Sequence, residues 1–410
     1  MHKFLKLNLF GGVITGTKSL TAGMMSALLA CTSGAVMVVR AGYVFDLSRA
    51  ELVSWLTAAY MVGGFLNLLL TLTYKIPFAG AHSITATGFL CTISAHFSFP
   101  ELAGAFVLSG VLLLLAGCTG LFTKMLGHLP KSLIDALLAG LLLPYVYNMG
   151  AAGMKLPLAF IMALIGYFII PRVIRVLPPS LWALLLGVIG LSLEIRIPPI
   201  GSAAFIAPLP VIPQFTWSGF WMISVPMALL ILSNDLAVAL AAVKSHQFEP
   251  PVNKVFMGSG IASIITGLCG GNAANVGGMM SALCSSPEAG PQEKRYWAAV
   301  VSSILVIGYG CFAWRIVDLL AVLPTPFVTI IAGFALLGLF VKGLKNAFSN
   351  SAGRIPALFT FLIAAFHIDG LGLSTPVWAL GSGLILLKLR TFLIPIRTGK
   401  SIRNHDENRD

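Results

Sequence analysis

The sequence predicts an all-α integral membrane protein with about fourteen transmembrane helices, arranged as two inverted repeats of seven. Three observations support this prediction. Apolar residues make up 57% of the 410 residues and charged residues 10%, with a mean hydropathy of +0.93, whereas a soluble domain carries about a quarter charged residues. Apolar windows of helical length recur along the chain, and landmarks of the first half recur in the second half.

The predicted spans follow one another through connections that contain charged residues, Pro or Gly. A helix needs about 20 apolar residues to cross a bilayer, and several windows are shorter than that. The first apolar run continues to about Val39, which is too long for the apolar part of a signal peptide, so we interpret it as a retained span. The predicted spans are 11–38, 52–73, 78–95, 101–122, 132–148, 157–171, 180–193, 220–243, 255–269, 272–285, 297–314, 325–341, 355–368 and 371–389.

The net charge of +12 is explained by membrane topology. With the N-terminus inside and fourteen crossings, twenty of the 26 Lys and Arg residues fall on the cytoplasmic side, as the positive-inside rule requires. Five Lys and Arg residues fall on the outer side, namely Arg40, Arg49, Lys155, Arg196 and Arg315. The remaining one, Lys18, lies within the first span near its cytoplasmic end, where snorkelling of its side chain to the interface explains it. We therefore expect a multi-pass protein of a bacterial cytoplasmic membrane, surrounded by lipid, with both termini cytoplasmic and no nucleic-acid partner.

Sequence landmarks repeat at an offset of 193 residues, give or take one. Ser109…Cys118 in the fourth span matches Ser302…Cys311 in the eleventh. Leu129-Pro130…Ala139-Gly140 then matches Leu323-Pro324…Ala332-Gly333. Because each repeat holds an odd number of spans, the second must enter the membrane inverted relative to the first. Inverted repeats are typical of secondary transporters, although a duplicated membrane fold can also form a channel.

The repeats give the predicted domain boundaries. Residues 1–196 form the first repeat and 220–396 the second. The Pro-rich stretch 197–219 is the connector between them, placed on the outer face. Residues 397–410 are polar, mixed in charge and free of aromatic residues, so we predict a disordered cytoplasmic tail.

Two short spans at matching positions in the repeats are interrupted by polar and helix-breaking residues. They are Ile76–Ala95 and Gly270–Ser286, and matched discontinuous helices of this kind indicate a transporter's binding site. A half-helix that begins inside the bilayer directs free N–H groups toward the break, which favours an anion. The alternative is that the Gly and Ala residues there only allow close helix packing. The side chains predicted to bind the substrate are His82, Ser83, Thr85, Asn234, Asn272 and Asn275.

Asp235 lies deep in the eighth predicted span, with no basic residue closer than nine positions. A carboxyl group inside the membrane is costly and usually functional. We predict that Asp235 is the proton-coupling residue, with Ser233 and Asn234 beside it. The alternative is a structural carboxyl bound to a backbone group or to Lys18.

The six cysteines show no close spacing, which disfavours disulfides and metal sites. We interpret them as small apolar residues of the spans and expect no metal and no cofactor. They are Cys31, Cys91, Cys118, Cys269, Cys284 and Cys311.

Several short motifs, in order, carry a resemblance to one family. The most specific is Cys284-Ser-Ser-Pro287-Glu288-Ala289-Gly-Pro, followed by Arg295-Tyr-Trp297-Ala-Ala. The others are Ser54-Trp55-Leu-Thr57, Leu72-Thr-Tyr74-Lys75-Ile-Pro77 and Thr119-Gly-Leu-Phe122…Leu129-Pro130. Over roughly residues 50 to 390 the chain resembles the BenE-type benzoate/proton symporters. The resemblance implies the fold of the uracil and sulfate permeases, in which a core domain holding spans three, eight and ten moves against a gate domain.

The resemblance also implies proton-coupled uptake of an aromatic carboxylate. The chain departs from the family at His82 and Asp235, because the family's third span is rich in Ser, Thr, Pro and Gly and its eighth carries neutral amides. This departure leaves a zwitterionic or larger substrate open. In similar folds homodimers are common, so a homodimer is a candidate assembly.

We therefore predict a secondary transporter that imports a small organic anion such as benzoate together with protons. A nucleobase or other anion permease of the same fold is the first alternative, and an anion channel is the second. An enzyme is disfavoured, because the nearest nucleophile–base pair, Ser83 and His82, consists of adjacent residues that point in different directions on a helix.

Overall fold

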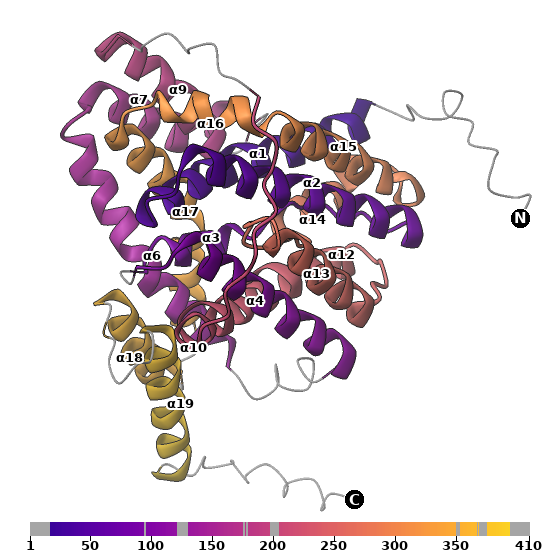
Figure 1. Ribbon diagram of the computed structural model, residues 1–410, viewed down its shortest axis with the longest axis vertical. Helices are drawn as coiled ribbons and strands as arrows, with labels where there is room; N and C mark the ends of the chain where they lie inside the picture. Colours follow the sequence, from indigo (N-terminus) through magenta and orange to yellow (C-terminus); the bar gives the residue numbers. More distant parts are fainter. Residues whose placement is uncertain are drawn as a thin grey trace, which may run out of the picture.

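The computed structural model describes residues 17–93, 96–120, 130–174, 177, 179–196, 205–349, 353–366, 368 and 375–393. These residues form helices joined by extended segments (Figure 1). The start of the first predicted span, part of the connector at 197–204 and the tail 397–410 lie outside the described residues. Residues 205–216 of the connector are not helical, and its last residues begin the next helix.

One group of helices, the first bundle, comes from both halves of the chain. Its strongest packing pairs are α4 with α13, α2 with α15, α1 with α15 and α12 with α14. Figure 1 shows these helices on one side of the molecule. Their bounds are α1 (Thr17–Val44), α2 (Arg49–Tyr74), α3 (Ile84–Leu90), α4 (Phe99–Thr119), α10 (Trp217–Gly219), η1 (Phe220–Ser224), α11 (Val225–Leu230), η2 (Ile231–Leu236), α12 (Ala237–Ser245), α13 (Val252–Gly267), α14 (Gly278–Ser285), η3 (Pro287–Ala289), η4 (Gln292–Lys294), α15 (Tyr296–Cys311) and α16 (Ala313–Ala321).

The second bundle is also built from both halves. In it α6 packs on α17 and α18, α7 on α9, and α18 on α19. Helices α1 and α3 of the first bundle reach it, since α1 contacts α17 and α9 and α3 contacts α6. Its helices are α6 (Lys131–Gly153), α7 (Pro157–Phe168), α8 (Ile170–Val173), α9 (Pro179–Glu194), α17 (Thr325–Ala347), α18 (Arg354–Ala365) and α19 (Thr375–Leu393).

Helix boundaries follow local capping chemistry. Before α2, the Ser48 N–H donates to Glu51 Oε2 at 2.7 Å, and the Ser48 side chain caps the Glu51 N–H in return. Ser98 and Glu101 make the same capping box at the start of α4. Each box satisfies backbone donors that the first turn leaves free. Helix α4 ends at Thr119 and is followed by the capping residue Gly120, whose φ of 60° is a left-handed conformation that glycine adopts at little cost.

By length and composition, six of the described helices can cross a membrane, or up to seven if one bent pair is counted as a span. The other predicted windows appear as shorter helices, including α9 and α18, or as broken segments. Between the predicted windows 297–314 and 325–341 the chain bends by 69° and continues as α16. Ala313, Val317 and Leu320 recur there at helical spacing and are buried.

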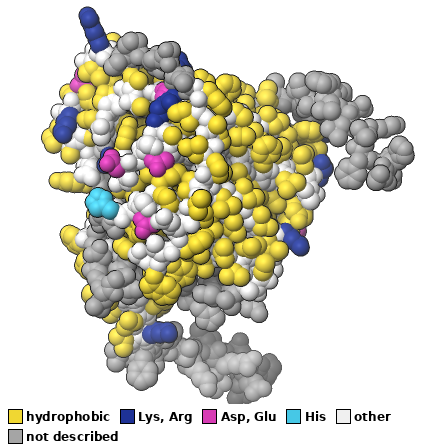
Figure 2. Space-filling view, viewed as in Figure 1, with side chains coloured by type: hydrophobic (Ala, Val, Ile, Leu, Met, Phe, Trp, Pro, Cys, Tyr) yellow, Lys and Arg dark blue, Asp and Glu magenta, His cyan; other side chains and the backbone are white. Residues whose placement is uncertain are grey.

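The surface is that of a membrane protein. Figure 2 shows hydrophobic side chains covering most of the visible face, with charged side chains few and scattered. Large apolar residues are widely exposed, such as Leu69 at 66% and Ile304 at 55%. A soluble monomer rarely exposes contiguous apolar patches of this extent, so this surface faces lipid. Cys118 and Cys311 also lie exposed on it, whereas Cys31, Cys91 and Cys284 are buried as expected.

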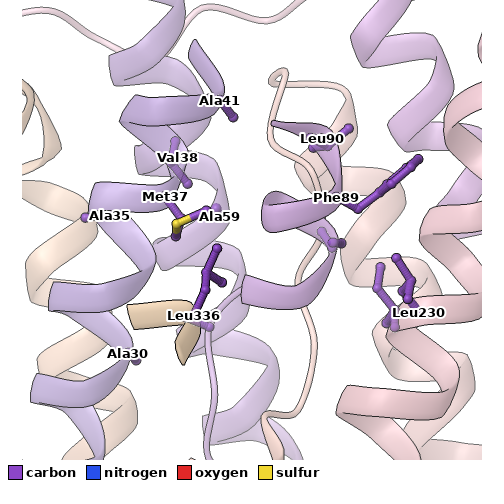
Figure 3. Close-up of a cluster of buried hydrophobic side chains, with 14 of the residues drawn as sticks. Ala30, Ala35, Met37, Val38, Ala41, Ala59, Phe89, Leu90, Leu230 and Leu336 are labelled. Atoms are coloured by element: carbon purple, nitrogen blue, oxygen red, sulfur yellow. The ribbon is translucent and has the colours of Figure 1, made fainter. Parts of the chain in front are cut away.

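The short helix α3 is held inside this fold by apolar packing. Figure 3 shows Phe89 and Leu90 of α3 between the buried side chains of α1, such as Met37, and Leu230 of α11. Leu336 of α17 reaches the same cluster from the second bundle. Helix α3 has only 7 residues and isolated helices that short are not stable, so this burial fixes its position.

Candidate functional site

The two interrupted segments lie side by side. The Asn275 N–H donates to the Ala81 carbonyl at 3.0 Å, and the Gly277 N–H donates to the Ala79 carbonyl at 2.9 Å. These bonds join two extended stretches that precede α3 and α14, so the backbone groups freed by the breaks satisfy each other. The Ser281 hydroxyl extends the pairing, because it accepts from the Ala79 N–H at 3.1 Å and donates to the Ala79 carbonyl at 3.0 Å.

The close approach of the segments depends on glycine. A Cβ atom on Gly80 would lie 2.4 Å from the Gly277 nitrogen and 2.6 Å from the Asn275 carbonyl oxygen. On α2, a Cβ atom on Gly63 would lie 2.2 Å from the Ala81 oxygen. All of these neighbours are backbone atoms. These glycines therefore allow the backbones to approach closely, and this approach brings together the polar cluster described next.

Asp235 is the centre of that cluster. It lies in η2, a π-helical stretch of the long helix from Trp217 to Ser245, and π turns occur often at functional sites. Its Oδ2 atom accepts hydrogen bonds from the Ser83 hydroxyl, from Thr85 Oγ1 at 3.0 Å and from Asn275 Nδ2 at 3.1 Å. Both interrupted segments thus converge on one carboxyl group. These partners are neutral, and Lys18, which the sequence offered as an alternative partner, is exposed at the start of α1.

His82 and Asn272 form a second layer behind this carboxyl. His82 Nε2 lies 3.3 Å from the Tyr60 hydroxyl, and His82 Nδ1 lies 3.3 Å from Thr87 Oγ1. Asn272 accepts from the Trp55 indole N–H at 3.1 Å and donates to Thr87 Oγ1 at 3.1 Å. The Asn272 side chain therefore connects α2 to α3.

A cavity of about 420 Å³ opens between the two bundles beside Asp235. Four of the seven residues predicted for the site line it, namely His82, Thr85, Asn234 and Asp235. Ser83, Asn272 and Asn275 are fully buried and are not among the lining residues, so their direct contact with a substrate stays a prediction. From the second bundle the lining includes Tyr167, Ser180, Phe334, Gly338 and Lys342.

The sequence analysis missed these residues of the second bundle. It placed Lys342 with the cytoplasmic charges that set topology, and it treated the helices that carry Tyr167 and Phe334 as plain spans. The rings of Tyr167 and Phe334 lie 5.3 Å apart, which joins α7 to α17 at the cavity wall. One signal was available in the sequence. Phe334, Gly338 and Lys342 are spaced by four, so they share one face of a helix.

Comparison with known proteins gives both sequence relatives and structural neighbours. Residues 15–389 match the family model BenE, described as benzoate membrane transport protein. The benzoate membrane transport protein of Acinetobacter baylyi is 26% identical over 369 residues, covering 89% of this chain and 93% of that protein. The inner membrane protein YdcO of Escherichia coli is 26% identical over 373 residues, covering 89% of this chain and 94% of that protein.

Two solved structures share the fold. The transmembrane domain of the cyanobacterial bicarbonate transporter BicA superposes with a TM-score of 0.60 at 16% identity, over 90% of this chain and 97% of that one. The structure of SLC26A9 superposes with a TM-score of 0.60 at 12% identity, over 93% of this chain and 66% of that one. At these identities the likeness concerns the fold.

Proposed function

The chain is a membrane transporter that belongs to the BenE family, and on this premise we propose that it imports a small aromatic carboxylate such as benzoate together with a proton. One observation carries the proposal. A single carboxyl group, Asp235, lies at the wall of a cavity between two helix bundles and is held there by hydroxyl and amide groups of two interrupted segments. No enzymatic activity is proposed, since the family and the structural neighbours are membrane transporters.

The proposal includes an architecture of two inverted repeats, 1–196 and 220–396, joined by a connector. Helix pairing supports it. If the offset of 193 residues is applied, α4 corresponds to α15 and α2 to α13, and the pairs α4·α13 and α15·α2 are both present. The same offset relates α7·α9 to α18·α19, which are also both present. In this scheme the first bundle is the core domain and the second is the gate domain, and their relative motion exposes the cavity to alternate sides.

The geometry supports a division of roles around the cavity. Asp235 would carry the coupling proton, and Thr85, Asn234 and His82 would orient the substrate. Gly277 and Gly278 also line the cavity at the start of α14, where no described side chain caps the helix. The Gly277 N–H already donates to the Ala79 carbonyl, so the N–H groups of α14 that begin with Gly278 would meet a carboxylate. The rings of Tyr167 and Phe334 offer an aromatic wall to the apolar part of the substrate.

The proposal is tested with purified protein in proteoliposomes and radiolabelled benzoate. The wild type should accumulate benzoate when an inward proton gradient is imposed. In Asp235→Asn the accumulation ratio should fall to about one, the value for uncoupled equilibration, because the substituted amide cannot carry a proton, while benzoate exchange continues. Asp318→Asn, which changes a carboxyl in α16 that does not line the cavity, is the matched control. Unchanged accumulation in Asp235→Asn would reject the coupling role.

The same vesicles separate the alternatives. Uptake of uracil or sulfate in place of benzoate would indicate another permease of the same fold. Uptake that never exceeds the electrochemical gradient of the solute would indicate a channel. A homodimer stays an expectation. Measuring the molecular mass of the purified protein in detergent tests it.

A further inference from the structure

Helix α17 presents three chemically different groups to the cavity along one face. Phe334, Gly338 and Lys342 all line it, and they are spaced by four residues, about one helical turn each. Phe334 is buried and contacts Tyr167, Gly338 is exposed and has no side chain, and Lys342 is exposed at the end of the stripe. The second bundle therefore places a positive charge at the exposed end of this cavity-lining stripe.

The charges of the cavity come from few groups. Among the described lining residues Asp235 is the one acid and Lys342 the one Lys or Arg, and His82 and Tyr167 are the other titratable side chains. When Asp235 is ionised, its charge and that of Lys342 cancel. When Asp235 is protonated, no described acid that lines the cavity compensates the charge of Lys342, and the cavity becomes attractive to an anion.

Lys342 is held near the cavity by its surroundings on α6. The Asp135 carboxyl is buried and faces the charges of Lys131 and Lys342, and the side chain of Asn346 hydrogen-bonds it. Helices α6 and α17 are among the most extensively packed pairs in the structure. One Asp135 oxygen, Oδ2, is buried without a hydrogen-bond partner among the residues that the structure describes.

We propose that Lys342 is the specificity-determining residue that selects anions in the cavity, and that its charge makes substrate binding and protonation of Asp235 cooperate. The inference rests on the proposed function and deepens it. Because linkage is reciprocal, a bound carboxylate favours the protonated form of Asp235 to the same extent that the proton favours the carboxylate. Lys342 thus supplies an electrostatic reason for symport of an anion with a proton.

The first test is equilibrium binding of benzoate to purified protein at low ionic strength. Lys342→Gln should weaken benzoate binding about threefold to tenfold, as expected for one partly solvated charge, and the loss should shrink as salt is added. Lys342→Arg should restore binding, and the uncharged analogue benzamide should bind wild type and Lys342→Gln alike. Lys345→Gln is the matched control, because Lys345 is exposed on the same helix but does not line the cavity. Equal benzoate affinities in Lys342→Gln, Lys345→Gln and wild type would overturn the inference and leave the proposed function intact.

A second test does not depend on the substrate. Gly338→Cys places a thiol one turn from Lys342, and a Cβ atom there meets the Tyr167 hydroxyl at 3.5 Å, an ordinary contact. The exposed Cys118 and Cys311 are first replaced by Ser. With Lys342 present, the thiol should react faster with an anionic than with a cationic methanethiosulfonate. Lys342→Gln should lower the ratio of these rates about threefold to tenfold.

The two tests separate the two claims. Suppose that the wild type binds no benzoate, but that Lys342→Gln lowers the ratio of the reaction rates with the anionic and the cationic reagent. Then the proposed substrate is wrong, and the selection of anions by Lys342 stands. If this ratio is the same in Lys342→Gln and Lys345→Gln, the inference is overturned, whatever the substrate.

Discussion

Gly80 is the residue at which the two interrupted segments come closest. Because Gly80 has no side chain, the Gly277 nitrogen and the Asn275 carbonyl oxygen can lie 2.4 Å and 2.6 Å from the position that a Cβ atom would take. Because both neighbours are backbone atoms of a buried pairing, they cannot rotate away as a side chain would. We expect Gly80→Ala to lower the free energy of unfolding by about 1–3 kcal/mol, as for other overpacked sites. Thermal unfolding in detergent, monitored by the loss of monodisperse protein, measures this decrease in stability.

The matched control is Gly308→Ala in α15, where a Cβ atom would meet nothing within 4 Å. That substitution should leave stability unchanged or raise it by up to about 1 kcal/mol, since alanine favours helix more than glycine does. If Gly80→Ala were as stable as Gly308→Ala, the close pairing of the two segments would be wrong.

Among the elements, α3 and α14 are the most dependent on tertiary contacts. Each is a helix of seven or eight residues that starts from a paired extended stretch. Ser281 of α14 bonds both the N–H and the carbonyl of Ala79. Ser281→Ala should therefore cost about 1–3 kcal/mol of stability, because it leaves the buried Ala79 N–H without a partner.

Thr360→Val in α18 is the control for the stability loss expected in Ser281→Ala. Thr360 is also fully buried, but its hydroxyl donates to the Pro356 carbonyl of its own helix, at 3.0 Å. Its removal leaves no backbone donor unpaired, so a smaller loss is expected, below about 1 kcal/mol. Thermal unfolding of Ser281→Ala and Thr360→Val under the same conditions compares the two losses of stability. Equal losses would argue against a special role for the hydrogen bonds between Ser281 and Ala79.

For the whole molecule, the distribution of basic residues predicts the orientation in the membrane. Helix α6 has 23 residues and a length of roughly 34 Å, enough to cross the hydrocarbon core. Lys131 at its start is expected in the cytoplasm and Lys155 just after its end is expected outside, and both are exposed. A membrane-impermeant thiol reagent applied to intact cells should thus label Lys155→Cys and not Lys131→Cys, in a background without Cys118 and Cys311. Labelling of Lys131→Cys alone would invert the topology.

The sequence also indicated much of the site at this scale. Asp235 could be singled out because an acid in a long apolar stretch is conspicuous, and the interrupted segments could be singled out because polar and Gly residues break an apolar pattern. The cavity wall formed by Tyr167, Phe334 and Lys342 could not. Tyrosine, phenylalanine and a terminal lysine are ordinary in a span, and only packing shows which side of the helix faces a cavity.

By itself, the sequence determined that the chain is helical and lies in a membrane, because hydropathy and charge placement are summed over many residues and tolerate local exceptions. It also determined the position of the two breaks and of the buried acid. The tertiary structure decided which helices are short, where the chain bends into α16, and that Ser83, Asn272 and Asn275 support the cavity from behind while Lys342 lines it. These features depend on contacts between residues far apart in the chain, such as Ser83 with Asp235, and a local pattern carries no information about the partner on the other side of such a contact.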